Sequence, residues 1–208
     1  MAAPRRTQQE RSQLARTSLI EAAINLIYER GFAQVTMADI AARTGFTRGA
    51  IQHHFEGRNE LVLAILHEVE SRVTKSFSEP LAHEKDSVAE RIDLLLEHLG
   101  EISRAPAYLA VIDIWLASRA EENLRDAVRQ SVLRSATSYR QLWQRVFGAD
   151  IPAKTISDCR RVVVAVLRGM ALTSVFTSDA NVHQATLATT KAIIRQYMLS
   201  NIRQNAAS

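Results

Sequence analysis

Apolar residues recur every three or four positions along almost the whole chain, and this spacing predicts amphipathic helices rather than strands. The first apolar stripe contains Leu19, Ala23 and Leu26 and predicts a helix over about 10–30, which Gly31 would end. The second half predicts five more helices: one with its apolar face over 88–102, one that begins at Pro106, and three over about 121–147, 153–178 and 182–204.

Two short helices with a tight turn between them are predicted in the first third of the chain. Thr36 and Asp39 have the spacing of a capping box, which predicts a helix over 37–44. Gly45 supplies a left-handed stop, and a second helix should follow over about 47–55. This arrangement is typical of a helix-turn-helix.

A long helix should begin at about Arg58 and end before Pro80, and either Asp86 or Ser87 can cap the helix after it. The chain is therefore predicted to be all-α, with two parts. An N-terminal three-helix DNA-binding domain occupies 1–57, and a larger C-terminal helical domain for ligand binding and dimerisation occupies 58–208. The core of the first domain should contain five apolar residues, namely Leu26, Phe32, Ile40, Ile51 and Phe55.

The helix-turn-helix segment also carries a family resemblance. From Thr36 the sequence reads T-M-A-D-I-A-A-R-T-G-F-T-R-G-A-I-Q-H-H-F-E-G-R-N-E-L, which resembles the DNA-binding signature of the TetR family of bacterial transcription regulators. The resemblance covers about the first third of the chain, and the second half is similar in architecture alone. Gln52 stands where the family usually has a tyrosine that contacts the DNA backbone, and Arg58 stands where it usually has a lysine.

The candidate DNA-binding residues are Thr36, Thr47, Arg48, Gly49, Gln52, His53, His54 and Arg58. Arg48 can donate two hydrogen bonds to guanine, and Gln52 can contact either adenine or a phosphate. The hydroxyls of Thr36 and Thr47 should cap their helices and also reach phosphates. Arg58 lies at a helix N-terminus, where an anion is favoured.

Further arginines and histidines in this region leave alternatives open. Arg11 and Arg16 belong either to a solvated end of the chain or to an arm that contacts DNA, whereas the solvated reading is favoured for Arg5 and Arg6. A metal site at His53 and its neighbour is disfavoured, since adjacent helical residues do not face each other.

Composition and charge add limits rather than an identity. The 208 residues carry a net charge of +4, which permits nucleic-acid binding without indicating it. Cys159 is the sole cysteine, so no intrachain disulfide can form, as suits a reducing cytoplasm. The longest apolar run, Val162 to Leu167, is too short to span a bilayer, and no export signal is recognised. We therefore expect a cytoplasmic protein without membrane contact.

An acid within an apolar helix suggests an effector site. Asp113 interrupts the apolar segment 108–117, so it is either a polar anchor in a ligand pocket or an acid at the surface or at a subunit interface. Arg168 is a possible partner for it. The remaining pocket candidates are aromatic or sulfur-containing: Tyr108, Trp115, Trp143 and Met170.

The last two helices are rich in small residues, among them Gly169 and Ala192, and we expect them to form a four-helix dimer interface with a second copy. Ordinary packing within the chain is the alternative. The family resemblance implies a homodimeric repressor that a small-molecule effector releases from a palindromic DNA operator. The alternative is an architectural or cell-division factor without an effector. No catalytic set, cofactor motif or metal-ligand spacing is found, which argues against an enzyme.

Overall fold

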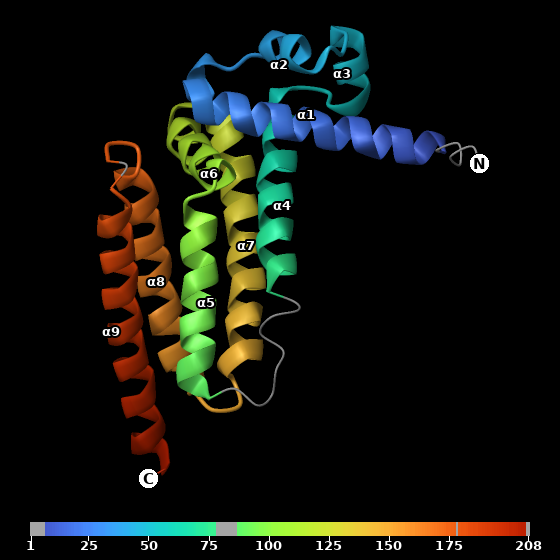
Figure 1. Cartoon of the computed structure of the whole chain (residues 1–208). Coiled ribbons are helices and arrows are strands. Elements are labelled where there is room, and N and C mark those ends of the chain that lie inside the picture. Colours follow the sequence, from blue (N-terminus) through green and yellow to red (C-terminus); the bar gives the residue numbers. More distant parts are fainter. Residues whose placement is uncertain (1–6, 78–86, 178, 207–208) are drawn as a thin grey trace, which may run out of the picture. The chain divides into compact units, whose positions relative to one another are not determined.

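A computed structural model describes residues 7–77, 87–177 and 179–206, and within them all regular secondary structure is helical (Figure 1). The elements are α1 (Gln8–Arg30), η1 (Phe32–Gln34), α2 (Met37–Thr44), α3 (Arg48–His54), α4 (Arg58–Ser76), α5 (Val88–Ser103), α6 (Pro106–Ala117), η2 (Ser118–Ala120), α7 (Glu122–Phe147), α8 (Ala153–Thr173) and α9 (Ala180–Ala206). The predicted all-α fold is thereby confirmed.

The chain forms two compact units, and three helices continue from one unit into the other. The first unit comprises Met1–Val69 and Ala110–Ser131, and the second comprises Glu70–Leu109 and Val132–Ser208. Sequence analysis placed a single boundary after residue 57. Helices α4, α6 and α7 each contribute residues to both compact units, so this division does not test the functional boundary, which stays a prediction.

The first unit is built as the sequence predicted, because its local signals are strong. Thr36 and Asp39 form a complete capping box at the start of α2, and Gly45 ends that helix with a φ of 73°. A residue with a Cβ atom adopts this left-handed conformation only with strain. The five predicted core residues of the first unit are all buried: Leu26, Phe32, Ile40, Ile51 and Phe55.

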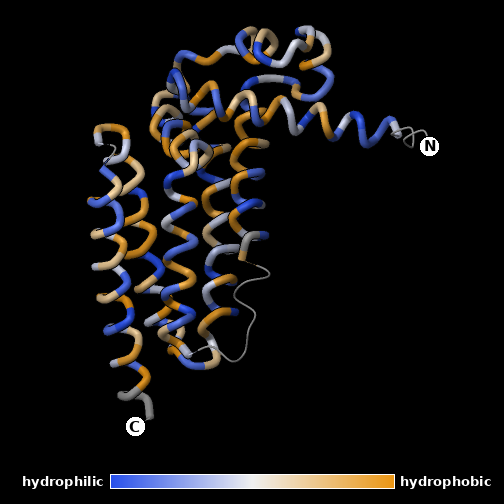
Figure 2. Tube along the Cα trace, viewed as in Figure 1, coloured by the Kyte–Doolittle hydropathy of each residue, from blue (hydrophilic) through white to orange (hydrophobic). Residues whose placement is uncertain are grey.

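The second unit is centred on α5, which packs against α8 and α9. Gly100 allows the contact with α9 to be close, since a Cβ atom at this position would lie 2.7 Å from Cδ2 of Leu187. One apolar cluster joins residues of α4, α5, α7, α8 and α9, and Trp143 lies inside it with 3% of its surface exposed. Along the helices of both units, hydrophobic and polar positions alternate (Figure 2).

Helix ends differ from expectation where apolar residues continue past the helix. Ser87 caps α5, whereas the alternative cap Asp86 and the predicted stop at Pro80 lie outside the described residues. Helix α8 ends at Thr173, about one turn earlier than predicted. The following Val175 and Phe176 are largely exposed, so their apolar character extended the predicted helix without marking a buried face.

Candidate DNA-binding surface

Helix α3 presents a polar face to solvent. Ile51 is buried beneath it, whereas Arg48, Gly49, Gln52 and His53 are exposed. No hydrogen bond or ion pair with another described residue engages the Arg48 guanidinium. An exposed helix face with an unpaired arginine and an amide suits the edges of bases in a major groove.

The two capping threonines differ in what they can still offer a phosphate. The Thr36 hydroxyl accepts a hydrogen bond from the backbone N–H of Asp39 and donates its own proton to the Asp39 carboxylate. The Thr47 hydroxyl accepts a hydrogen bond from the backbone N–H of Ala50 at 3.2 Å, and its own proton meets no acceptor among the described residues. Because a phosphate needs a donor, Thr47 can serve as a cap and a phosphate ligand together, whereas Thr36 can do so only by releasing Asp39.

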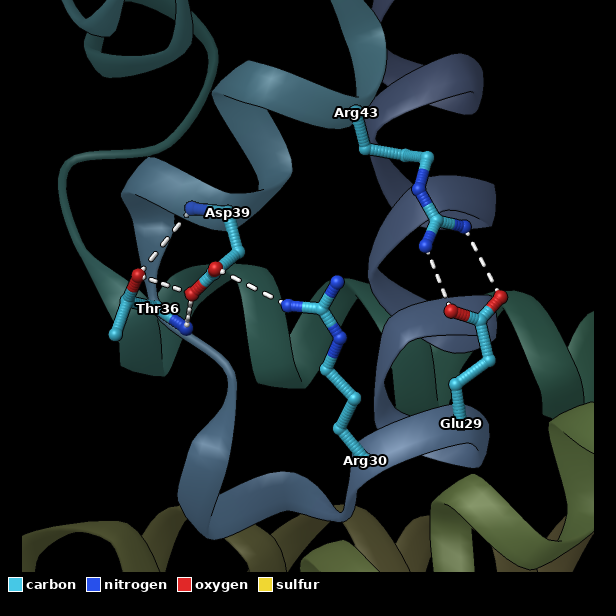
Figure 3. Close-up of polar contacts among 5 residues, drawn as sticks. All are labelled: Glu29, Arg30, Thr36, Asp39 and Arg43. Atoms are coloured by element: carbon cyan, nitrogen blue, oxygen red, sulfur yellow. Dashed lines mark hydrogen bonds and ion pairs between the residues drawn. The ribbon is translucent and has the colours of Figure 1, made fainter.

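Two ion pairs join α1 to α2 and thereby orient the helix-turn-helix (Figure 3). Arg43 donates to both carboxylate oxygens of Glu29, at 3.0 and 2.6 Å, and Arg30 lies 3.3 Å from Asp39. The hydrogen bond from Arg43 lowers the pKa of Glu29, and the hydrogen bonds from Thr36 lower the pKa of Asp39. Since the first pair is bidentate, it fixes direction as well as distance.

Arg16 holds the far end of α3. Its Nη1 atom donates to the backbone oxygen of His54 at 2.7 Å, and its guanidinium lies 4.3 Å from the centre of the Phe55 ring. A cation at a helix C-terminus also complements the helix dipole. Sequence analysis left open whether Arg16 is solvated or contacts DNA, and here it binds the protein. Arg11, by contrast, is exposed. Burial, the first cause, together with nearby positive charge, lowers the pKa of His54.

Arg58 also faces the protein. Its Nη2 atom donates to the backbone oxygen of Phe32 at 2.8 Å, and its guanidinium lies 4.0 Å from the centre of the Phe32 ring. Its Nη1 atom lies 3.7 Å from the Glu121 carboxylate. The prediction that Arg58 binds a phosphate at the N-terminus of α4 therefore gains no support from this geometry.

Asp113 binds the same residue from the other side. Its Oδ2 atom accepts a hydrogen bond of 2.5 Å from the backbone N–H of Phe32. Both backbone polar groups of Phe32 are thus held by charged side chains, one from α6 and one from α4. We call Phe32, Arg58 and Asp113 the Phe32 clamp. Sequence analysis singled out Asp113 as an unusual acid and left open whether it anchors a ligand or lies at the surface or at a subunit interface. Its observed partner is a backbone N–H group.

The other pocket candidates are spread over both units. Asp113 and Trp115 belong to the first unit, whereas Tyr108, Trp143 and Met170 belong to the second. Trp143 packs in the apolar core of the second unit, where its ring centre lies 5.8 Å from that of Phe147. The pocket assignment as a whole stays a prediction.

Tyr108 and Met170 have surroundings that a ligand could use. Burial raises the pKa of Tyr108, and the charge and hydrogen bond of Arg168 oppose that rise. Arg168, the suggested partner of Asp113, thus interacts with a phenol. Met170 lines a groove of about 280 Å³ between the end of α8 and the start of α9, together with Gly169 and His183.

Among the described helices, none combines the length and the apolar character that a membrane span needs.

Comparison with known proteins supports the reading of the first unit. Residues 19–65 match the family model described as bacterial regulatory proteins, tetR family. The HTH-type transcriptional regulator CymR of Pseudomonas putida is 27% identical over 199 residues, which cover 94% of this chain and 97% of CymR. The segment 19–65 that matches the family model contains α2 and α3. CymR is named as a transcriptional regulator and not as an enzyme.

Solved structures show the same fold. A transcriptional regulator from Pseudomonas aeruginosa PAO1 superposes with a TM-score of 0.69 at 22% identity, over 95% of this chain and 99% of that one. The multidrug binding protein EbrR, complexed with imidazole, superposes with a TM-score of 0.58 at 20% identity, over 95% of this chain and 97% of its own. The chain, with its helix-turn-helix and its nine described α-helices, is a DNA-binding transcriptional regulator of the TetR family of bacterial proteins.

Proposed function

We propose that the chain is a cytoplasmic homodimeric repressor that a small-molecule effector releases from a palindromic operator. Each first unit would read one half-site with α3. Two recognition helices can engage together only when the half-sites lie about 34–36 Å apart or a multiple of that distance. The exposed polar face of α3 is the observation that carries the proposal.

The residues of that face have separate tasks in the proposal. Arg48 reads a guanine, and Gln52 contacts an adenine or a phosphate in place of the ring that the family usually has. The free proton of Thr47 makes it the better phosphate ligand of the two threonines. Gly49 lets the helix approach the DNA closely, and His53 and His54 flank the contact.

Support for the dimer comes from a stripe of exposed small and apolar residues on the last two helices. The six residues of this stripe are all exposed in the single chain: Val162, Ala165, Gly169, Ala188, Thr189 and Ala192. A Cβ atom at Gly169 would meet nothing within 4 Å. The cost of a glycine inside a helix is therefore not offset by packing within the chain, and a second copy at this face would offset it.

Support for an effector comes from EbrR, which is named as a multidrug binding protein and was solved with imidazole. In our proposal the effector binds in the second unit near Tyr108 and Met170, and it favours a conformation with lower DNA affinity. Such an effector acts only through its different affinities for the two conformations, and typical couplings are about 1–3 kcal/mol.

The test is a binding measurement on DNA taken from the region upstream of the protein's own gene. Fluorescence anisotropy with overlapping duplexes should locate a palindrome, and inserting half a helical turn between its half-sites should abolish tight binding. Candidate effectors are then titrated into the complex. Release of DNA by one of them, with derepression of a reporter, supports the proposal. Tight operator binding that no compound weakens would favour the alternative factor without an effector.

A further inference from the structure

The second unit carries a row of arginines with no acidic residue among them. Along α7, Arg134, Arg140 and Arg145 follow one another, and the nearest acids in the sequence are Asp126 and Asp150. All three arginines on this part of the helix are exposed or half-exposed, and no ion pair engages them within the described chain. Such a run leaves a positively charged surface.

Two acids on the neighbouring segments, Asp150 and Asp158, do not neutralise this surface, because each already pairs with another cation. Asp150 pairs with Arg91. Asp158 on α8 pairs with Arg161, and it also binds Lys154 at 2.8 Å. The hydrogen bond from Lys154 is the first cause of the lowered pKa of Asp158. The carboxylates of Asp150 and Asp158 are therefore committed to cations other than the α7 arginines, and Glu70 of α4 accepts a hydrogen bond from the hydroxyl of Ser135 on α7.

Arg160 on α8 adds a fourth guanidinium group, and its buried Nε–H lacks a hydrogen-bond acceptor in the described chain. Burial lowers the pKa of Arg160, and the positive charges of Arg140 and Arg161 lower it further, so Arg140 lies within electrostatic range of Arg160. A buried donor without an acceptor is unfavourable, and so is a set of like charges, so an anion bound here would relieve both.

A groove lies at this place. It is an open depression on the surface of α7 with a volume of about 510 Å³, and it is lined by Arg140, Gln141, Gln144 and Arg145. Its lining is unlike that of a site for an apolar ligand, which is mostly hydrophobic. Guanidinium groups match phosphate oxygens with two parallel hydrogen bonds, and the glutamine amides add neutral donors.

We propose that this groove binds a small molecule carrying a diphosphate group, held by Arg140 and Arg145 with help from Arg160. A diphosphate carries several negative charges in a small volume, so one molecule can pair with three guanidinium groups at once. Duplex DNA is the competing partner, and it would contact the exposed arginines along the helix alike. Arg134, which does not line the groove, separates the two cases.

The experiment is isothermal titration of the full-length protein with inorganic pyrophosphate at about 0.15 M ionic strength, where distant exposed charges are screened. We expect saturable binding of one pyrophosphate per chain. Arg140→Gln and Arg145→Gln should each weaken it about tenfold, since each removes a charge-assisted hydrogen-bonding pair. Arg134→Gln, the matched control on the same helix, should change it by less than about twofold.

Arg160 is partly buried, so its role is tested with a conservative substitution. Arg160→Lys keeps the charge and loses the planar fork, so it should weaken pyrophosphate binding while the thermal midpoint stays near that of the native protein. Absent saturation, or an equal loss in Arg134→Gln and Arg140→Gln, would overturn the proposal. The proposal would also be overturned if both variants lost affinity for random duplex DNA to the same extent while pyrophosphate did not bind. Without pyrophosphate, Arg140→Gln should bind the operator with native affinity. The pyrophosphate site and the proposed repressor function can therefore be refuted independently of each other.

Discussion

Asp113→Ala tests the Phe32 clamp directly. The substitution removes the acceptor of the Phe32 N–H, which lies in a residue with only 3% of its surface exposed. A buried backbone donor left without an acceptor costs about 1–3 kcal/mol, and hydrogen bonds to charged groups lie in the upper part of that range. We expect a loss of about 2 kcal/mol. For a chain of this length that corresponds to a drop of roughly 4–8 °C in the thermal midpoint.

The clamp also predicts a change in DNA binding that a ligand anchor would not. Phe32 begins the connection from α1 to α2, so loosening it should let the helix-turn-helix move and weaken operator binding even when no effector is present. If Asp113 instead held an effector, Asp113→Asn would change the effector response alone. Asn keeps an oxygen acceptor, so under our reading Asp113→Asn should lose less stability than Asp113→Ala.

The assays are urea unfolding and operator titration, with Asp126→Ala as the control. Asp126 is an exposed acid of α7 in the same unit, so its removal makes the same change in charge. The control should stay within about 0.5 kcal/mol of the native protein, as is usual for surface substitutions. Equal unfolding free energies for Asp113→Ala and Asp126→Ala would refute the clamp.

Four further predictions concern the rest of the molecule. Arg48→Ala should weaken operator binding by about 1–3 kcal/mol and relax one base position, and equal losses on operator and random duplex would deny it a base contact. Arg16→Ala should lower affinity for all sequences by about 1 kcal/mol, because the end of α3 loses its cap, and retention of native affinity would count against this. Light scattering should find a dimer that Gly169→Leu converts to monomer, whereas a native monomer at micromolar concentration would contradict the interface. Burial lowers the pKa of His54 and His183, so the unfolded chain binds more protons; stability should fall as pH drops below about 6.5, and less so in a variant with both changed to Gln, as urea midpoints at two pH values can decide.

The sequence predicted those parts of the fold that depend on neighbouring residues. The capping box at Thr36, the turn at Gly45 and the proline that opens α6 follow from rules that span four or five positions, and each lies where expected. Asp113 shows where such rules end. Its position in an apolar helix marked it as unusual, but its partner is 81 residues away in the sequence. Periodicity carries no information about a contact over that separation.

The arginines of the first unit also make contacts that the sequence does not predict, and these contacts affect DNA affinity. Arg16, Arg48 and Arg58 all suit a phosphate by residue type and position, and sequence alone cannot rank them. Two of them bind backbone oxygens that lie 38 and 26 residues away, and only Arg48 is left without a protein partner in the described chain. Each phosphate contact contributes about 0.9 to the slope of log K against log salt. The slope should therefore be smaller by about two per head than a count of all three arginines predicts, and a measured slope that needs all three would mean that DNA opens both internal contacts.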